Sequence, residues 1–320
     1  MKFGVFVPQG WRMDLADVAD PVEKFETMVR CAKEAEAAGF DAIWLYDHFH
    51  TVPEPRQESV FECWSSMAAL ARETQTVRLG QMVTCNSFRP PSLLAKMASC
   101  IDVMSRGRVI LGIGAGWYQH EYAAYGYDFP ETPERLRMLR ESLQVIKAMW
   151  TQDEAAFDGS YYHLRGAINE PKPVQKPHPP IWIGGGGERV TLKLVAQYGD
   201  ACNLSASVDV LRHKLDVLRE HCAVAGRDYD SILKTVELYA ILGDKREVDR
   251  VVRETARRVG KDEAWVRSWH PWHGDADRVA EMIGEIAEAG AQYFIVNLPN
   301  AAEGGAITRF AEEVFARIAR

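Results

Sequence analysis

An acid and an imidazole stand side by side at Asp47 and His48, directly after the apolar run Ile43–Tyr46. Four consecutive apolar residues predict a strand buried on both faces, as in a parallel sheet. Ligands bind at the carboxyl ends of such strands. Asp47 could orient His48 and raise its pKa, so that His48 exchanges a proton with a ligand. Alternatively, both only hydrogen-bond a ligand, or Asp47 caps the next turn and His48 is a bystander.

A run of four glycines, Gly184–Gly187, joins a predicted strand to a helix that we expect to start near Glu188. Successive backbone amides at a helix N-terminus form a ready anion site. Because no Gly-Lys-Ser or Gly-Lys-Thr follows, the run is not a P-loop. It would suit the phosphate of a cofactor.

Two further groups of residues follow the third and fourth predicted strands. Arg89, held extended by the proline after it, could bind an anion or anchor its own loop. Gly112, Gly114 and Gly116 crowd the end of the fourth strand, where glycine lets a flat ligand lie on the backbone. A bend in the strand would explain the same glycines.

Aromatic and imidazole side chains near several predicted strand ends indicate a pocket for a flat substrate. His270 and His273 are three residues apart, but no third ligand accompanies them, so we predict no metal site. No Gly-x-Ser-x-Gly or His-Glu-x-x-His motif supports nucleophilic hydrolysis or zinc-peptidase chemistry. The residues expected in the pocket are Trp11, Phe49, Trp117, His270 and Trp272.

The composition limits the classes of partner. The chain has 320 residues, 47% of them hydrophobic, which allows two ordinary domains or one large α/β barrel. Its net charge of −7 argues against nucleic acid and against an anionic membrane surface. The cysteines are scattered, so we expect neither disulfides nor a zinc ribbon. The apolar start is too short for a signal peptide, and no run suits a membrane-spanning helix, so we expect a cytoplasmic protein.

Gly39, Gly199 and Gly290 each end a predicted helix shortly before an apolar strand, as in a parallel α/β fold. Eight strands with intervening helices predict a single (β/α)8 TIM barrel domain over residues 1–320. A doubly wound sheet is the alternative, but Trp117 stands where the third glycine of its G-x-G-x-x-G fingerprint would be. The predicted strands are Phe3–Val7, Ala42–Tyr46, Val77–Val83, Arg108–Ile113, Pro180–Gly184, Ala201–Leu204, Leu233–Leu242 and Gln292–Leu298.

An insertion is expected between the fourth and fifth strands. The predicted helix Thr132–Trp150 is followed by residues 151–179, which contain several prolines and the hairpin-like segment FDGSYYHLRGA. Long insertions at the top of a barrel often cover an active site, and a surface excursion is the alternative. Other predicted helices are Val22–Ala38, Val60–Glu73, Pro91–Met104, Val190–Gln197, Val208–Ala225 and Asp275–Ala289.

Several blocks of the chain resemble the luciferase-like monooxygenase superfamily, and most closely its branch that uses the deazaflavin coenzyme F420. They span nearly the whole sequence, and the most specific are RPPSLLAKMASCIDVMSRGRVILGIGAGW and PPIWIGGGGERVTLKLVAQYGDACN. The pair Asp47-His48 points to the F420 branch, since FMN-using relatives more often carry Glu-His there. The other matching blocks are FGVFVPQG, AGFDAIWLYDHF, VRLGQMVT and GDADRVAEMIGEIAEAGAQYFIVNLP.

The resemblance implies a (β/α)8 barrel with an insertion after the fourth strand and a deazaflavin at the carboxyl ends of the strands. Asp47 and His48 would lie near the reactive ring, and a non-prolyl cis peptide at Met82–Val83 would back it. The region Gly185–Glu188 would hold the phosphate. Carried over position by position, the cofactor contacts are Asp47, Met82, Val83, Thr84, Ala115, Gly184, Gly185, Gly186, Gly187, Glu188 and Asn203.

The chain departs at two places from the sugar-phosphate dehydrogenases of this branch. Those enzymes have a catalytic Glu after the fourth strand, where this chain has Ala115-Gly116. They also have a Trp shortly after the Asp-His pair, where this chain has Thr51-Val52-Pro53. The differences argue against oxidation of a sugar phosphate, leave the proton donor open and favour reduction of the substrate.

The leading hypothesis is an oxidoreductase that transfers a hydride between coenzyme F420 and a small organic substrate, with His48 exchanging a proton and Asp47 tuning it. An FMN-dependent monooxygenase of the same fold is the alternative, and a non-catalytic flavin-binding protein is a third. The resemblance also implies a homodimer formed through helices near the second and third strands. The apolar residues of Phe61–Leu70 allow this, although a stripe facing the core explains them equally well.

Overall fold

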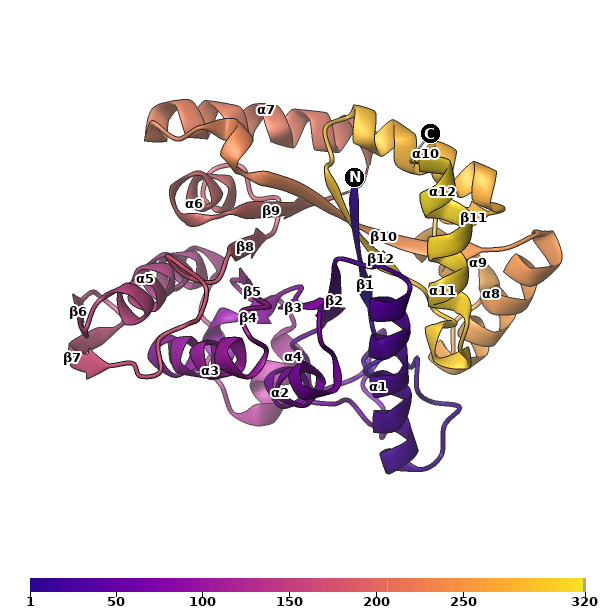
Figure 1. Ribbon diagram of the computed structural model, residues 1–320, viewed down its shortest axis with the longest axis horizontal. Helices are drawn as coiled ribbons and strands as arrows, with labels where there is room; N and C mark the ends of the chain where they lie inside the picture. The colour runs from indigo at the N-terminus through magenta and orange to yellow at the C-terminus, as the bar shows by residue number, and fades with distance from the viewer. Residues whose placement is uncertain (206, 319–320) are drawn as a thin grey trace.

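The computed structural model describes residues 1–205 and 207–318. Within them, eight parallel strands close into a barrel, because β9 at one end of the strand order also pairs with β10 near the other. Helices surround the barrel (Figure 1), so the predicted (β/α)8 fold is confirmed and the doubly wound sheet is wrong. In order around the barrel the strands are β1 (Lys2–Phe6), β2 (Ala42–Leu45), β3 (Arg78–Gln81), β5 (Val109–Gly114), β8 (Ile181–Gly184), β9 (Ala201–Leu204), β10 (Leu233–Leu242) and β12 (Tyr293–Asn297).

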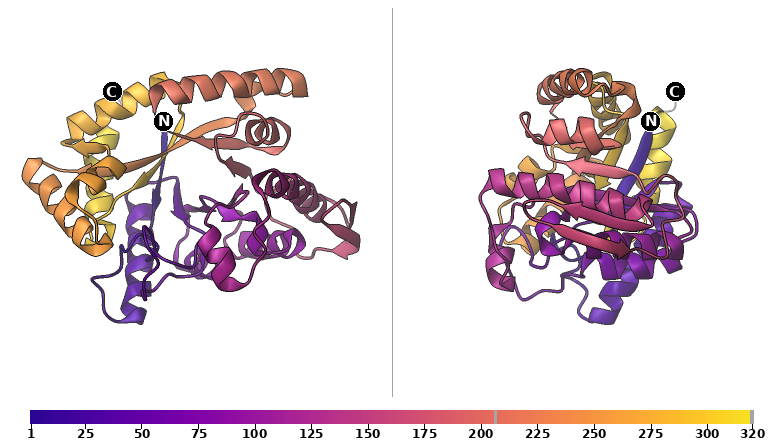
Figure 2. Two further views of the ribbon diagram at one scale, coloured as in Figure 1. Left: turned by 180° about the vertical axis from the view of Figure 1, so that it is seen from behind. Right: turned by 90° about the vertical axis from the view of Figure 1, so that its left-hand side faces the viewer.

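The helices lie on the outside of the barrel in all three views (Figures 1 and 2). Short helical turns η1 (Asn86–Phe88), η2 (Tyr229–Ser231) and η3 (Ala301–Glu303) and the π-helical turn η4 (Ala311–Phe315) complete the connections. The α-helices are α1 (Pro21–Ala37), α2 (Cys63–Glu73), α3 (Pro91–Met104), α4 (Gln119–Tyr125), α5 (Thr132–Thr151), α6 (Thr191–Tyr198), α7 (Val208–Ala225), α8 (Lys245–Val259), α9 (Glu263–Trp269), α10 (Ala276–Glu288), α11 (Ala306–Phe310) and α12 (Ala316–Ile318).

The first helix shows how local sequence sets these elements. The side chain of Asp20 accepts hydrogen bonds from the first free backbone amides of α1, and Pro21 occupies the first helical position. Met28 and Ala32, four residues apart, are buried on the face toward the barrel. Gly39, with φ +83°, ends the helix and turns the chain into β2.

The apolar stripe of α2 also faces inward. Trp64, Met67 and Leu70 are buried against the barrel, so the core explains these three, whereas Phe61, Ala68 and Ala69 are only partly buried. The homodimer itself stays a prediction.

Trp44 of β2 fills the barrel interior beneath the strand ends. A Cβ on Gly4 would lie 2.2 Å from the indole nitrogen, and one on Gly80 would lie 2.5 Å from the ring, so both neighbouring strands need glycine there. Trp182 and Tyr293 pack against the same indole. This packed layer closes the barrel interior below the carboxyl ends of the strands.

Residues between α5 and β8 form a hairpin at the edge of the molecule (Figure 1). Its strands β6 (Glu154–Asp158) and β7 (His163–Ile168) pair antiparallel. The buried carboxylate of Glu141 in α5 accepts hydrogen bonds from the backbone amides of Ser160 and Tyr161 and so fastens the turn.

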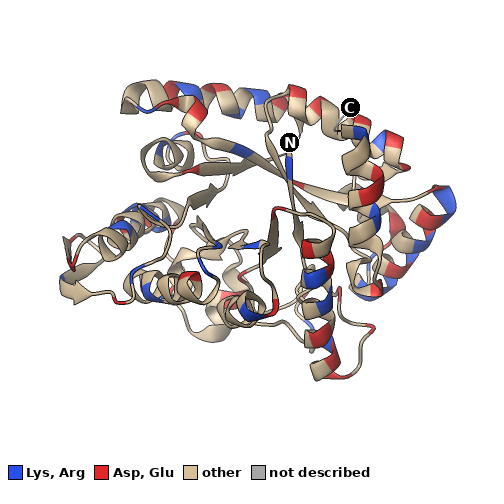
Figure 3. Ribbon diagram, viewed as in Figure 1, with Lys and Arg blue, Asp and Glu red and all other residues tan. Residues whose placement is uncertain are grey.

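Charges of both signs alternate along the outer helices, as α7 and α8 show (Figure 3). Such mixing is typical of a solvated face. Among the described helices, none combines the length and apolarity needed to cross a membrane.

Candidate active site

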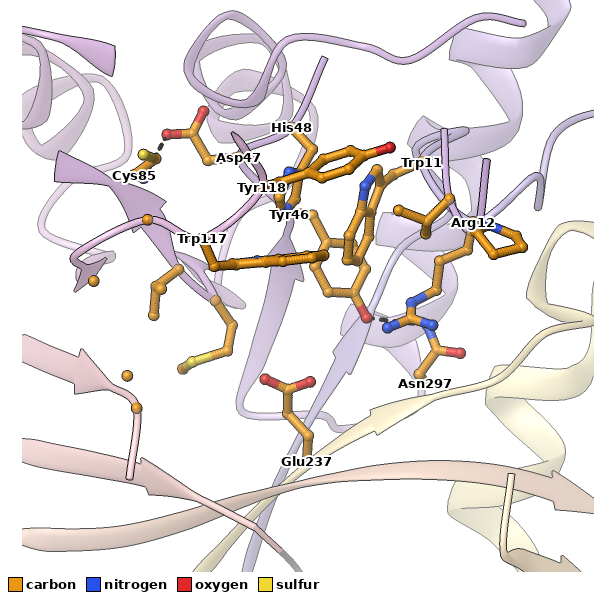
Figure 4. Close-up of a pocket in the computed structure, with 18 of the residues that line it drawn as sticks. Trp11, Arg12, Tyr46, Asp47, His48, Cys85, Trp117, Tyr118, Glu237 and Asn297 are labelled. Carbon is orange, nitrogen blue, oxygen red and sulfur yellow. Dashed lines mark hydrogen bonds between the residues drawn. The ribbon is translucent and has the colours of Figure 1, made fainter. Parts of the chain in front are cut away.

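A cavity of about 770 Å³ lies at the carboxyl ends of the barrel strands (Figure 4). Small-molecule sites span roughly 300–1,000 Å³. The wall is built from residues that follow the strands: Trp11 after β1, His48 after β2, Trp117 after β5, Gly185 after β8 and Pro299 after β12. Most of that wall is apolar, so the cavity suits a largely apolar molecule.

His48 is held by a carboxylate that the motifs did not indicate. Its Nδ1 lies 2.7 Å from Oε2 of Glu121 in α4, and Oε1 of Glu121 accepts hydrogen bonds from the backbone amides of Phe49 and His50. Trp11 stacks on the imidazole with ring centroids 4.3 Å apart. Nε2 is the ring nitrogen that remains for a ligand, so the ring is oriented for proton exchange.

This contact adds an acid after the fourth strand that sequence reasoning missed. The chain does carry Ala115 and Gly116 immediately after β5, but Glu121 in the next short helix reaches His48. The preference for substrate reduction, which rested on Ala115 and Gly116, stays a prediction. A Glu in the first turn of a helix close behind a strand end is the signal that could have indicated it.

Asp47 does not contact the ring of His48 as expected. Both its oxygens accept hydrogen bonds from the guanidinium of Arg89, at 2.6 and 2.9 Å, and Oδ2 also accepts from the hydroxyl of Thr84 and the amide of Cys85. Asp47 is therefore a buried anchor between β2 and the short strand β4 (Thr84–Cys85). Of the two alternatives for Arg89, the structure shows the loop anchor.

One side of the cavity, which we call the glycine wall, is formed by Val83, Gly114 and Gly184. The peptide bond between Met82 and Val83 is cis, as the resemblance implied. A Cβ on Gly114 or on Gly184 would lie 2.7 Å from a methyl group of Val83. Glycine at both positions therefore lets the Val83 side chain pack against both β5 and β8.

Most of the expected cofactor contacts line the cavity, but three do not. Thr84 is buried by its hydrogen bonds to Asp47 and Trp64. Gly186 and Glu188 do not line the cavity. The Glu188 carboxylate instead contacts α7, where it lies 2.5 Å from Nζ of Lys214. Helix α6 begins at Thr191 and not near Glu188 as expected. The expected contacts that line the cavity are Asp47, Met82, Val83, Ala115, Gly184, Gly185, Gly187 and Asn203.

Three of the five expected substrate-pocket residues line the cavity: Trp11, Trp117 and His270. Phe49 does not line the cavity and packs on the lining residue Phe88, with ring centroids 4.7 Å apart. Trp272 belongs to the short strand β11 (Trp272–Gly274), which pairs with β10, and it packs against the core outside the barrel.

A polar group that sequence reasoning missed lies away from the glycine wall. Nη2 of Arg12 donates to the Tyr239 hydroxyl at 2.8 Å, and that hydroxyl donates to Oε2 of Glu237 at 2.6 Å. The amide of Asn203 donates to Oε1 of Glu237 at 3.1 Å, and burial raises the pKa of Glu237. An acid two residues from a Tyr, in the otherwise apolar β10, is the signal that both face the barrel interior.

The cover over the cavity comes from the connection after the seventh barrel strand. Arg258 of α8 and Trp265 and Trp269 of α9 line the cavity, whereas no described residue of 151–179 does. The expectation that the insertion covers the site is therefore wrong, and the alternative of a surface excursion fits.

Among the described residues, no cluster of three or more His, Cys, Asp or Glu side chains could hold a metal ion.

Comparisons with known proteins agree on the fold. The sequence matches the family profile described as luciferase-like monooxygenase over residues 1–295. It is 28% identical to the F420-dependent glucose-6-phosphate dehydrogenase of Amycolatopsis mediterranei over 318 residues, covering 91% of this chain and 94% of that protein.

Two solved structures illustrate the range of enzymes on this barrel. An F420-dependent secondary alcohol dehydrogenase with an F420-acetone adduct superposes with a TM-score of 0.80 at 22% identity, covering 99% of this chain and 98% of that one. An EDTA monooxygenase from Chelativorans sp. BNC1 gives 0.82 at 16% identity, covering 100% and 93%. The shared fold alone therefore does not choose between the two chemistries.

Proposed function

The chain belongs to the luciferase-like monooxygenase family, and from this premise we propose that it is an oxidoreductase transferring a hydride between coenzyme F420 and a small organic substrate. The observation that carries the proposal is the similarity, over 91% of the chain, to a relative whose name states F420 dependence. The substrate in that name is not carried over, because the aromatic cavity does not suit a sugar phosphate.

The residues of the cavity fit a planar ring with a phosphate-bearing chain. The glycine wall, where the Val83 side chain packs over Gly114 and Gly184, offers an apolar surface for the ring. Gly185 and Gly187 line the cavity next to it and are exposed, so their backbone is accessible to an anion ahead of α6. F420, when bound, supplies the carbon that gives or accepts the hydride.

His48 is the residue that we expect to exchange a proton with the substrate. Glu121 holds its Nδ1 and Trp11 fixes its ring plane, which leaves Nε2 for the ligand. General acid–base catalysis contributes roughly 10²–10⁴-fold to a rate. A His48→Ala variant should therefore bind F420 as the wild type does and lose turnover to that extent, and full turnover would rule out this role.

The test of the function is an equilibrium titration of the purified protein with F420 and, separately, with FMN, followed by cofactor fluorescence. Micromolar or tighter F420 binding with weak FMN binding supports hydride transfer. The reverse preference would reject the proposal in favour of an FMN-dependent monooxygenase, which oxygen consumption with reduced FMN would then establish. Tight F420 binding without turnover across substrate classes would favour a non-catalytic flavin-binding protein.

A further inference from the structure

We propose that Arg12 recognises the carboxylate of a planar, otherwise apolar substrate bound in the part of the cavity away from the glycine wall. The inference deepens the proposed function and rests on it for the reaction, whereas carboxylate binding can be measured independently. Figure 4 shows Arg12 and Asn297 on the opposite side of the cavity from Cys85.

Arg12 is a charged donor that contacts no carboxylate directly; the acid near it, Glu237, is linked to it through the Tyr239 hydroxyl. Its Nη2 donates to Tyr239, but its Nε is buried without a hydrogen-bond partner in the described structure. Within the described residues, no carboxylate lies within ion-pair distance of it, and Glu237 acts on it only from beyond the Tyr239 hydroxyl. A guanidinium carries five N–H donors and keeps its charge, and a buried donor without a protein partner is available to a water or to a ligand.

Four aromatic rings hold the Arg12 guanidinium in place. Its Cζ lies 4.8 Å from the ring centroid of Trp11, 5.4 Å from that of Tyr46, 4.4 Å from that of Tyr239 and 5.7 Å from that of Trp269. Cation–π contacts stabilise the charge without neutralising it. A guanidinium fixed in this way is prepared for a planar carboxylate, which arginine binds with fork-like geometry.

The other cationic or basic groups near the described cavity are already accounted for. Nη2 of Arg258 donates to the Pro299 carbonyl and the Thr255 hydroxyl, and its Nε lies 3.9 Å from Asp17. Burial lowers the pKa of His270 to about 4, so this imidazole is neutral at neutral pH. Among the described lining residues, Arg12 is thus the cation best placed to take an external anion.

The remaining wall sets the chemical class of the ligand body. Trp11, Trp117, Tyr118 and Trp269 present large ring surfaces to the cavity. Most sugar hydroxyls would meet ring surface there and lose water, whereas an aromatic or alicyclic carboxylate would bury its carbons against these rings. A planar apolar acid therefore fits better than a sugar phosphate.

Isothermal titration calorimetry of the full chain with benzoate, benzamide and glucose 6-phosphate tests the inference, with and without saturating F420. We expect benzoate to bind, and both other probes to bind at least roughly tenfold more weakly because they lack a carboxylate or an apolar body. Arg12→Met should remove the preference for benzoate over benzamide. Arg12→Lys keeps the charge but loses the planar guanidinium, so it should retain part of the preference for benzoate over benzamide. If Arg12→Met does not fold, Arg12→Lys provides the test instead.

Arg219 of α7, an exposed residue paired with Asp216, provides the control, since Arg219→Met should bind benzoate as the wild type does. Absence of benzoate binding at millimolar concentration, equal binding by Arg12→Met, or preferred binding of glucose 6-phosphate would overturn the inference. Weaker F420 binding by Arg12→Met would also overturn it, because Arg12 would then be a cofactor contact. Selective benzoate binding by a protein that ignores F420 would uphold carboxylate recognition and reject the proposed function.

Discussion

The carboxylate of Glu121 accepts hydrogen bonds from three consecutive residues, His48, Phe49 and His50. Glu121 is fully buried. Its removal would leave the two backbone amides and the ring nitrogen without an acceptor in a place that water does not reach, and unmade buried hydrogen bonds are costly. This one side chain therefore sets both the shape of the loop after β2 and the direction of the imidazole.

We expect Glu121→Ala to lower the free energy of unfolding by roughly 3–5 kcal/mol, because it orphans several buried donors at once. Glu121→Gln should cost less, since its amide oxygen still accepts from the two backbone amides. Urea unfolding followed by circular dichroism measures both. An alanine variant within about 1 kcal/mol of the wild type would contradict this reading.

Glu237 should make carboxylate binding depend on pH. Burial raises its pKa, and the charged and titratable groups that face it are Arg12, Tyr46 and Tyr239. Below the raised pKa the Glu237 carboxyl is neutral and Arg12 attracts an anion at full strength. Above it, the Glu237 carboxylate opposes the anion, so benzoate affinity should fall as the pH rises through that pKa.

Calorimetric titrations from about pH 5 to about pH 9 measure this dependence, a range in which neighbouring His270 stays mostly neutral because its pKa is about 4. Glu237→Gln removes the proton without changing the shape of the side chain and should give a flat profile. The same slope in that variant would assign the pH dependence to another group.

At the scale of elements, the barrel strands and most helices could be predicted because each depends on local pattern. The predicted strand Ala201–Leu204 and the predicted helix Pro91–Met104 coincide with β9 and α3. The partners of a side chain at a strand end could not be predicted in the same way. Glu121 and His48 are 73 residues apart in the sequence and Arg12 and Tyr239 are 227 apart, so their contacts depend on barrel closure and on the path of the loops.

The Asp47–Arg89 pair connects the end of β2, the start of α2 and the loop before α3, so its loss should destabilise all three. Arg89 binds Asp47 after β2 and Glu62, whose side chain caps α2. Arg89→Met leaves Asp47 as a buried carboxylate without a counter-ion, which typically costs roughly 3–5 kcal/mol. The double variant Asp47→Asn, Arg89→Met should lose less than the sum of the single variants, as chemical denaturation in a double-mutant cycle would show. Additive losses would mean that the pair does not act as a unit.

At the scale of the whole molecule, α3 offers a further apolar face for the predicted homodimer. On α3, Leu93, Met97, Cys100 and Met104 recur at intervals of four, three and four residues, and Leu93 and Met104 are exposed. We expect analytical ultracentrifugation to show a dimer at micromolar concentration. Substituting Leu93→Glu together with Met104→Glu should give a monomer of unchanged unfolding free energy. A monomeric wild type would end the prediction, and a dimeric double variant would move the interface elsewhere.

The connection formed by α8 and α9 can change the substrate specificity of this barrel independently of the glycine wall. It lies between β10 and β11 and supplies one part of the cavity lining, while the glycine wall comes from the middle of the chain. Residues 245–271 could therefore be exchanged as a cassette between paralogues, or randomised in a directed-evolution library, with the glycine wall left intact. Substrate specificity could then be selected while the residues proposed for hydride transfer stay unchanged.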